Sequence, residues 1–144
     1  MFRITNTEHR ITNIEHQKTN TDIMNRQTIR PILTLEIEAQ TEIEKFQNEV
    51  LRPILKMQND LLAQIFKHYC EKRKGIFDKL SDKDKCIYIE QSLKKDMKFK
   101  QYLEGIITGM FTLEEYNKFM ENENELTKRM INMMVQRLQS QILK

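Results

Sequence analysis

The chain has 144 residues and a formal net charge of +3, enough length for one compact domain with a core but too little positive charge to indicate nucleic-acid binding by itself. It contains only three glycines and two prolines, so tight turns are scarce, which argues against a β-sandwich or a β-barrel. Hydrophobic residues make up 39% and charged residues 31%, a balance that suits helices with solvated outer faces.

No segment of the sequence predicts a membrane anchor or a secretion signal. The longest stretch without a charged residue is Gly105–Leu113, which is far shorter than a membrane span. Behind Arg3 there is no apolar stretch of the kind found in signal peptides. The two cysteines, Cys70 and Cys86, fit a reducing compartment better than a disulfide framework. We therefore expect a soluble, cytoplasmic protein with no membrane partner.

The start of the chain nearly repeats itself, as RITNTEH followed by RITNIEH over residues 3–16. A coiled-coil heptad needs two apolar positions in each repeat, and these units do not supply them. Their two histidines lie two helical turns apart, which is too far to hold one metal ion. We expect residues 1–23 to be a disordered tail or an over-long gene start, and residues 24–144 to be a single helical domain that begins soon after Met24.

Apolar residues recur every three or four positions from Leu35 to Ile65, which predicts one face of a long helix. Pro53 falls inside this pattern, and the pattern stays in phase across it. Pro53 therefore either kinks one long helix or begins a second helix at its first turn. We expect this helical region to end near Lys74, with Gly75 in the left-handed conformation that closes many helices.

Three further helix starts follow from residues that cap helices. Ser81 is placed to cap one helix, and Asp96 to cap a shorter one that Gly109 closes. The sequence at Thr112–Glu115 is a capping box, which opens a final helix to about Leu143. No stretch alternates apolar and polar residues for long enough to predict a strand. The sequence predicts an all-α fold, an antiparallel bundle of four or five helices in which the first and last are long.

Two stretches, LRPILKMQNDLLAQIFKHYCEKRKGIFDKLS and GMFTLEEYNKFMENENELTKRMINMMVQRL, carry a resemblance to known proteins. They resemble a group of short all-helical bacterial proteins of uncharacterised function that often carry the automatic label glyoxalase. The resemblance covers roughly residues 46–144 and implies an enzyme of the lactoylglutathione lyase type. The residues themselves do not supply the several fixed ligands that a metal needs to polarise a carbonyl, since His68 is the only histidine beyond the opening repeat.

Weak candidates for metal or thiol chemistry lie near the end of the predicted first helix. His68 and Glu71 share a helix face at i, i+3, while Cys70 points elsewhere. Two ligands fall short of the four, or three plus water, that zinc requires, and a histidine near a helix C-terminus is also favoured by the helix dipole. Cys86 has no base in view and is better read as a small apolar residue. We expect no metal, no cofactor and no catalytic residues.

The segment Lys67–Lys100 is the most basic, with eleven lysine or arginine residues against six acids. Interleaved aromatic residues would allow base stacking, but the acids are scattered among the lysines, as on an ordinary solvated helix surface. The residues chosen for this basic surface are Lys94, Lys95, Lys98 and Lys100. By contrast, Glu114–Glu125 contains five glutamates against one lysine. Opposite patches of this kind favour protein partners or self-association over nucleic acid.

The final helix carries an apolar arc of about 200°, wider than the roughly 100° of a single core-facing stripe. Methionine is common on adaptable binding surfaces, so the partner-binding candidates are Met130, Met133, Met134 and Leu138. The alternative is a central helix wrapped by its own bundle. The helix is also expected to bend or protrude around Asn122–Asn124, because Glu123 interrupts the apolar arc there.

The sequence thus predicts a protein-interaction or self-associating module, with a protein partner or a homodimer as its assembly. The alternatives are the glyoxalase-labelled enzyme that the resemblance implies and, third, nucleic-acid binding through the basic segment 67–100.

Overall fold

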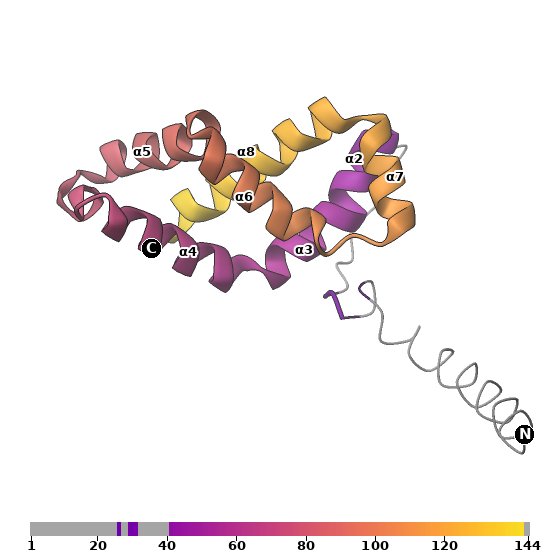
Figure 1. Cartoon of the computed structure of the whole chain (residues 1–144), viewed down its shortest axis with the longest axis horizontal. Coiled ribbons are helices and arrows are strands. Elements are labelled where there is room, and N and C mark those ends of the chain that lie inside the picture. The colour runs from indigo at the N-terminus through magenta and orange to yellow at the C-terminus, as the bar shows by residue number, and fades with distance from the viewer. Residues whose placement is uncertain (1–25, 27–28, 32–40, 143–144) are drawn as a thin grey trace, which may run out of the picture. The chain divides into compact units, whose positions relative to one another are not determined.

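The computed structural model describes Arg26, residues 29–31 and residues 41–142, and these are the residues discussed below. The chain divides into two compact units, Met1–Arg30 and Pro31–Lys144. Nearly all described residues, which Figure 1 draws in colour, belong to the second unit.

Part of the predicted organisation lies outside the described residues. This holds for residues 1–23, expected to be a tail, for Met24, and for the first apolar positions of the long stripe at residues 35–40. In the first unit, the side chain of Arg30 donates from Nε to the carbonyl oxygen of Arg26 at 2.6 Å.

Every regular element among the described residues is helical, which confirms the all-α prediction for this part of the chain. None of these helices is both long and apolar enough to cross a bilayer. In chain order the elements are α2 (Glu42–Phe46), the π-helical η1 (Gln47–Leu51), α3 (Arg52–Met57), α4 (Asn59–Lys72), the 3₁₀-helical η2 (Ile76–Lys79), α5 (Asp82–Lys95), α6 (Met97–Thr108), α7 (Leu113–Glu121) and α8 (Glu123–Ile142).

The long first helix is divided into segments, and α3 begins at Arg52, directly before Pro53, although the backbone stays helical there. The chain remains helical through Pro53, which sits in the first turn of α3. Directly before it, the backbone N–H of Arg52 bonds to the carbonyl of Gln47, five residues back, so one wide turn precedes the proline. A wide turn accommodates a residue that has no N–H and whose ring crowds the preceding turn. The interruption comes later, at Gln58, with φ −88° and ψ 4°.

The predicted helix caps are confirmed. The side chain of Ser81 accepts a bond from the N–H of Asp84 at 3.2 Å at the start of α5. At Thr112 both arms of the capping box are present, because Glu115 Oε1 in turn accepts from the N–H of Thr112 at 2.9 Å. Gly75 has φ 62°, as predicted, although α4 ends slightly earlier than expected, at Lys72. Each cap supplies an acceptor or a conformation that the end of a helix lacks.

The predicted final helix is two helices. Asn122, with φ −134° and ψ 41°, separates α7 from α8, so the interruption expected around Asn122–Asn124 is confirmed. The chain turns there because a residue with this backbone conformation cannot continue an α-helix.

Helix α8 passes through the middle of the second unit. Figure 1 shows α4 leading to one end, where η2 turns the chain, and α5 returning from it, while α7 lies at the opposite end. Side-chain hydrogen bonds join α8 to both α4 and α5. Gln141 donates to Asn59 Oδ1 on α4, and Gln139 donates to the carbonyl of Cys86 on α5, each at 3.0 Å. The fully buried side chains around α8 include Leu51, Ile54, Leu55, Ile89, Leu93, Leu103, Ile107, Leu126, Met130 and Met134.

Candidate functional site

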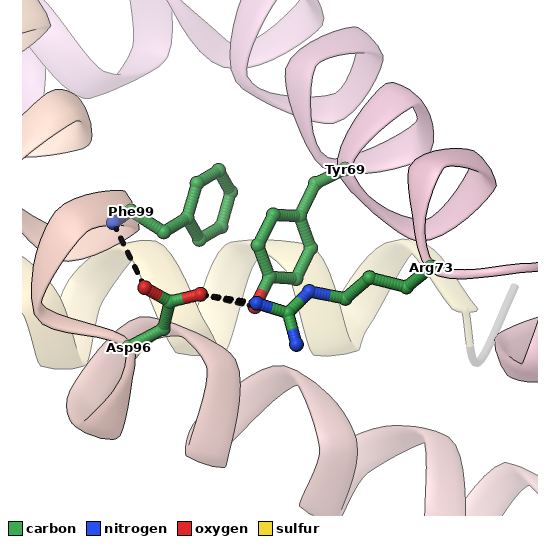
Figure 2. Close-up of polar contacts among 4 residues, drawn as sticks. All are labelled: Tyr69, Arg73, Asp96 and Phe99. Atoms are coloured by element: carbon green, nitrogen blue, oxygen red, sulfur yellow. Dashed lines mark hydrogen bonds and ion pairs between the residues drawn. The ribbon is translucent and has the colours of Figure 1, made fainter.

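A connected group of polar side chains is centred on Asp96, at the junction of α5 and α6 (Figure 2). Asp96 Oδ1 accepts a hydrogen bond from the N–H of Phe99 at 3.2 Å and so caps α6. Asp96 Oδ2 accepts from the hydroxyl of Tyr69 at 2.8 Å and from Nη2 of Arg73 at 2.5 Å. We call Tyr69, Arg73, Asp96 and Phe99 the Asp96 cluster. One carboxylate thus starts α6 and ties the end of α4 to it.

Aromatic packing holds Tyr69 in place. Its ring stacks on the ring of Phe99, with centroids 3.9 Å apart and planes 16° apart. The guanidinium carbon of Arg73, directly after α4, lies 4.4 Å from the centroid of the Tyr69 ring. Stacked aromatic pairs and cations over aromatic rings each add about 0.5–1.5 kcal/mol at such sites. The Asp96 cluster therefore fixes the angle between α4 and the α5–α6 junction.

The electrostatics of the Asp96 cluster favour a structural role. Burial, and then the hydrogen bond to Asp96, raise the pKa of Tyr69 to about 12. The pKa of Asp96 is lowered, first by the bond from Tyr69, then by the N–H of Phe99 and by the charge of Arg73. At neutral pH the tyrosine is therefore protonated and the aspartate ionised, and the bond between them is charge-assisted. Neither group is poised to exchange a proton near neutrality.

The weak metal candidates lie together but gain no further ligands. Nδ1 of His68 lies 3.3 Å from Glu71 Oε2, which confirms the predicted shared face, and Nε2 lies 3.2 Å from Nε2 of Gln64. Both side chains are exposed on the outer side of α4. Within the described residues, no group of three or more His, Cys, Asp or Glu side chains could hold a metal ion.

The cysteines are free thiols, and Cys70 lines a small cavity. The cavity has a volume of about 190 Å³ and lies between α4, η2, α5 and α8, with Phe66, Phe77 and Leu138 among its apolar walls. Burial, and then the charge of Asp78, raise the pKa of Cys70 to about 12. A thiol with so high a pKa is a poor nucleophile, so Cys70 packs as an apolar residue.

The methionine-rich face of α8 is not a surface. Met130, Met134 and Leu138, chosen from the sequence for partner binding, are buried in the domain's own core, and only Met133 is partly exposed. The prediction was wrong for the three buried residues, because helical spacing alone does not reveal which neighbours cover a face. The helices α5, α6 and α7 and the segment η1 all pack on α8, which matches the alternative of a central, wrapped helix.

The basic residues chosen from the sequence divide into two groups. Lys94, Lys95 and Lys98 are exposed at the α5–α6 junction, although Lys94 pairs with Glu90 at 2.9 Å. Lys100 is partly buried and lies near Glu104, the pKa of which is raised by burial and lowered in part by this lysine. Met97, between the exposed lysines, is 56% exposed. We call Lys94, Lys95, Met97 and Lys98 the lysine corner.

An exposed apolar stripe on α7 was missed by sequence reasoning. Leu113, Tyr116 and Met120 are 78%, 44% and 43% exposed. They lie at i, i+3 and i+7, within an arc of about 60° on a helical wheel. We call them the α7 stripe. Phe119, which borders this arc on the helical wheel, is buried. The spacing was visible in the sequence, but the side of the helix facing the core was not.

Comparison of the chain with protein-family models, with curated proteins and with solved structures finds no match in any of the three.

Proposed function

We propose that this helical bundle is a self-associating module, in which the α7 stripe of one copy docks on the lysine corner of another. The observation that carries the proposal is the α7 stripe, three neighbouring large apolar side chains left exposed on one helix face. Single exposed apolar residues are common on protein surfaces, but a contiguous row with a charged border is typical of an interaction site.

The border of the α7 stripe is acidic. On a helical wheel Glu114 and Glu121 lie on the solvent side of the stripe, about 80–100° from Leu113. Both glutamates are exposed, and Lys118 lies within 3.6 Å of Glu114 only. This border would repel the same border of a second copy in a symmetric contact between two α7 helices, because like charges would face one another. A partner surface with basic borders fits better.

The lysine corner has the complementary character on the same chain. Met97 projects between two lysines on its N-terminal side and one on its C-terminal side, and all are exposed. The acid within the corner, Asp96, is turned inward to Tyr69 and Arg73, so it does not cancel the charge of the lysines at the surface (Figure 2). A flexible methionine flanked by cations can insert between the side chains of an apolar row bordered by anions.

A contact between two different surfaces is heterologous, and it generates rings or open chains rather than a symmetric dimer. The mass of the assembly should therefore grow with protein concentration beyond two subunits. Added salt should weaken the contact, because its charged borders are solvent-exposed and screened within about 10 Å at 0.1 M.

Two surface variants test this geometry. Leu113→Glu removes the stripe and leaves the lysine corner, while Met97→Glu does the reverse. Both side chains are exposed, so neither change removes core packing. By light scattering at tens of micromolar, each variant alone should be a monomer, and an equimolar mixture should form a dimer and stop there. This complementation is specific to a heterologous contact.

The matched control is Ile76→Glu, a comparable change at an exposed apolar residue outside both surfaces, which should assemble like the unaltered chain. A strictly monomeric unaltered chain at hundreds of micromolar would refute self-association. If the mixture of the two variants stayed monomeric while the unaltered chain dimerised, the contact would be symmetric and the pairing of the α7 stripe with the lysine corner would be wrong.

A further inference from the structure

A parallel seam joins α8 to the segments η1, α3 and α4, because the residue numbers on both sides rise in the same direction along it. At one end, Nη1 of Arg129 donates to Gln47 Oε1 at 2.8 Å, and at the other, Nε2 of Gln141 donates to Asn59 Oδ1 at 3.0 Å. The two bonds are separated by equal lengths of chain on each side, about 18 Å at 1.5 Å per residue. Side chains that lie between these two bonds on both elements therefore face a common surface.

Two arginines lie within this seam. Arg137 follows Arg129 by two turns of α8 and precedes Gln141 by one, so it lies on the face that carries both bonds. On the other side, Arg52 lies between Gln47 and Asn59, at the start of α3. The positive charge of Arg52 acts on Arg137, the pKa of which is lowered first by burial and then by this neighbour. We call Arg52 and Arg137 the arginine pair.

The arginine pair lacks the neutralising partners that other arginines of the domain have. Arg129, on the same seam, pairs with Glu125 at 3.0 Å, and Arg73 pairs with Asp96. Among the described residues, neither Arg52 nor Arg137 has a carboxylate within ion-pair distance. A partly buried cation with a second cation near it is unfavourable, because desolvation and like charge both disfavour the ionised form of Arg137.

The geometry of the arginine pair suits an oxyanion. Nε of Arg52 donates to Asn48 Oδ1 at 2.8 Å, which orients the guanidinium and leaves its two Nη groups free of described protein acceptors. The side chain of Arg137 makes no hydrogen bond with any described residue, so all of its donors are available. Planar guanidinium groups match the oxygens of phosphate with paired hydrogen bonds. Lys56, one turn after Arg52 and exposed, adds a further positive charge on the same side of α3 as Arg52.

We propose that Arg52 and Arg137, on the seam between α3 and α8, bind a phosphate-class oxyanion. The site is separate from both surfaces of the proposed self-association. A dianion between the two guanidiniums would replace their mutual repulsion by attraction and would satisfy donors that the described protein atoms do not. Free phosphate and the phosphate group of a small monoester present the same three oxygens, so the site accepts either source when its mouth is open enough for the ester group.

The test is titration calorimetry on the full chain in phosphate-free buffer at low salt. The probes are inorganic phosphate and methyl phosphate, with acetate as a carboxylate comparison. We expect saturable binding of at least one phosphate probe, and weaker binding of acetate. Binding of methyl phosphate would identify a site open to monoesters, and binding of inorganic phosphate alone would identify a site for the free ion. If neither phosphate probe bound, the proposal would be overturned.

Variants identify the groups responsible. Arg52→Gln and Arg137→Gln should each weaken phosphate binding by about tenfold or more, since hydrogen bonds to charged groups are lost. The control Lys98→Gln removes the same charge at the lysine corner and should leave the affinity within about twofold, because a remote exposed charge is screened. Equal weakening by all three changes would reduce the effect to net charge and would refute a specific site.

A second measurement guards against misfolded variants. In phosphate-free buffer Arg137→Gln should melt at or above the temperature of the unaltered chain, because the change removes like-charge repulsion. Added phosphate should raise the melting temperature of the unaltered chain and leave that of Arg137→Gln unchanged, since only a ligand that binds the folded state stabilises it. An equal rise in both proteins would contradict the site.

Discussion

Asp96→Ala should destabilise the domain far more than the loss of a helix cap. The change removes the acceptor of the Phe99 N–H, which costs about 1 kcal/mol for an N-cap. It also deprives the Tyr69 hydroxyl of its charged acceptor, about 1–2 kcal/mol at a partly buried position. The ion pair with Arg73 adds at most about 1 kcal/mol, because the arginine is half-exposed. The expected loss in free energy of unfolding is about 2–4 kcal/mol.

Urea unfolding followed by circular dichroism measures this loss, with Ser81→Ala as the matched control. Ser81 caps α5 through the same kind of bond, at the same length, but its side chain makes no further hydrogen bond to any described residue. Its replacement should therefore cost only about 1 kcal/mol. Asp96→Asn should fall between the two, since asparagine caps helices well but carries no charge. Equal losses for Asp96→Ala and Ser81→Ala would refute the tertiary role of the Asp96 cluster.

The lowered pKa of Asp96 also predicts how the free energy of unfolding changes in acid. The folded state lowers the pKa of Asp96, so its stabilisation is present above the unfolded-state value and is lost as the pH falls through the folded-state value. The difference in free energy of unfolding between the unaltered chain and Asp96→Asn should therefore be largest near neutral pH and shrink in acid. A difference that stayed constant down to about pH 2 would show that the charge of Asp96 does not contribute.

Further outcomes concern the thiol, the core and the enzyme alternative. Burial raises the pKa values of Tyr69 and Cys70 to about 12. The stability that these protonated groups contribute is present below their unfolded-state pKa values and should be lost as the pH rises toward about 12. The free energy of unfolding, measured with urea, should therefore fall less between about pH 8 and about pH 11 in Tyr69→Phe than in the unaltered chain. Met134→Ala should cost about 2–5 kcal/mol and Met133→Ala much less, because only Met134 is fully buried; equal costs in urea unfolding would contradict the burial of α8. The purified protein should show no methylglyoxal–glutathione turnover, and activity that His68→Ala abolished would support the glyoxalase alternative instead.

Features that depend on a few neighbouring residues could be predicted from the sequence. The cap at Asp96, the capping box at Thr112 and the left-handed Gly75 all follow from groups within a few positions of one another. A cap residue satisfies a backbone donor three residues away, so it acts whatever the rest of the chain does. The shared face of His68 and Glu71 was predictable for the same reason.

The roles of Asp96 beyond the cap could not be predicted. Its bonds to Tyr69 and Arg73 join residues separated by more than twenty positions, and no local pattern relates them. The arginine pair is a still longer-range example, since Arg52 and Arg137 come near one another only because α8 packs parallel to the first helices. The two arginines are ordinary in the sequence, and they become a candidate site only because tertiary packing brings residues that are far apart in the chain close together in space.

The sequence by itself determined that this protein is helical, where most of its helices begin, and that the last apolar region is interrupted near Asn122. Only the tertiary structure decided which apolar stripe became core. Met130 and Met134 on α8 and Leu113 and Met120 on α7 recur at similar helical spacing, yet the first pair is buried and the second is exposed. Spacing fixes which side chains share a face, but burial depends on whether other helices pack against that face, and here they surround α8 and leave one side of α7 open.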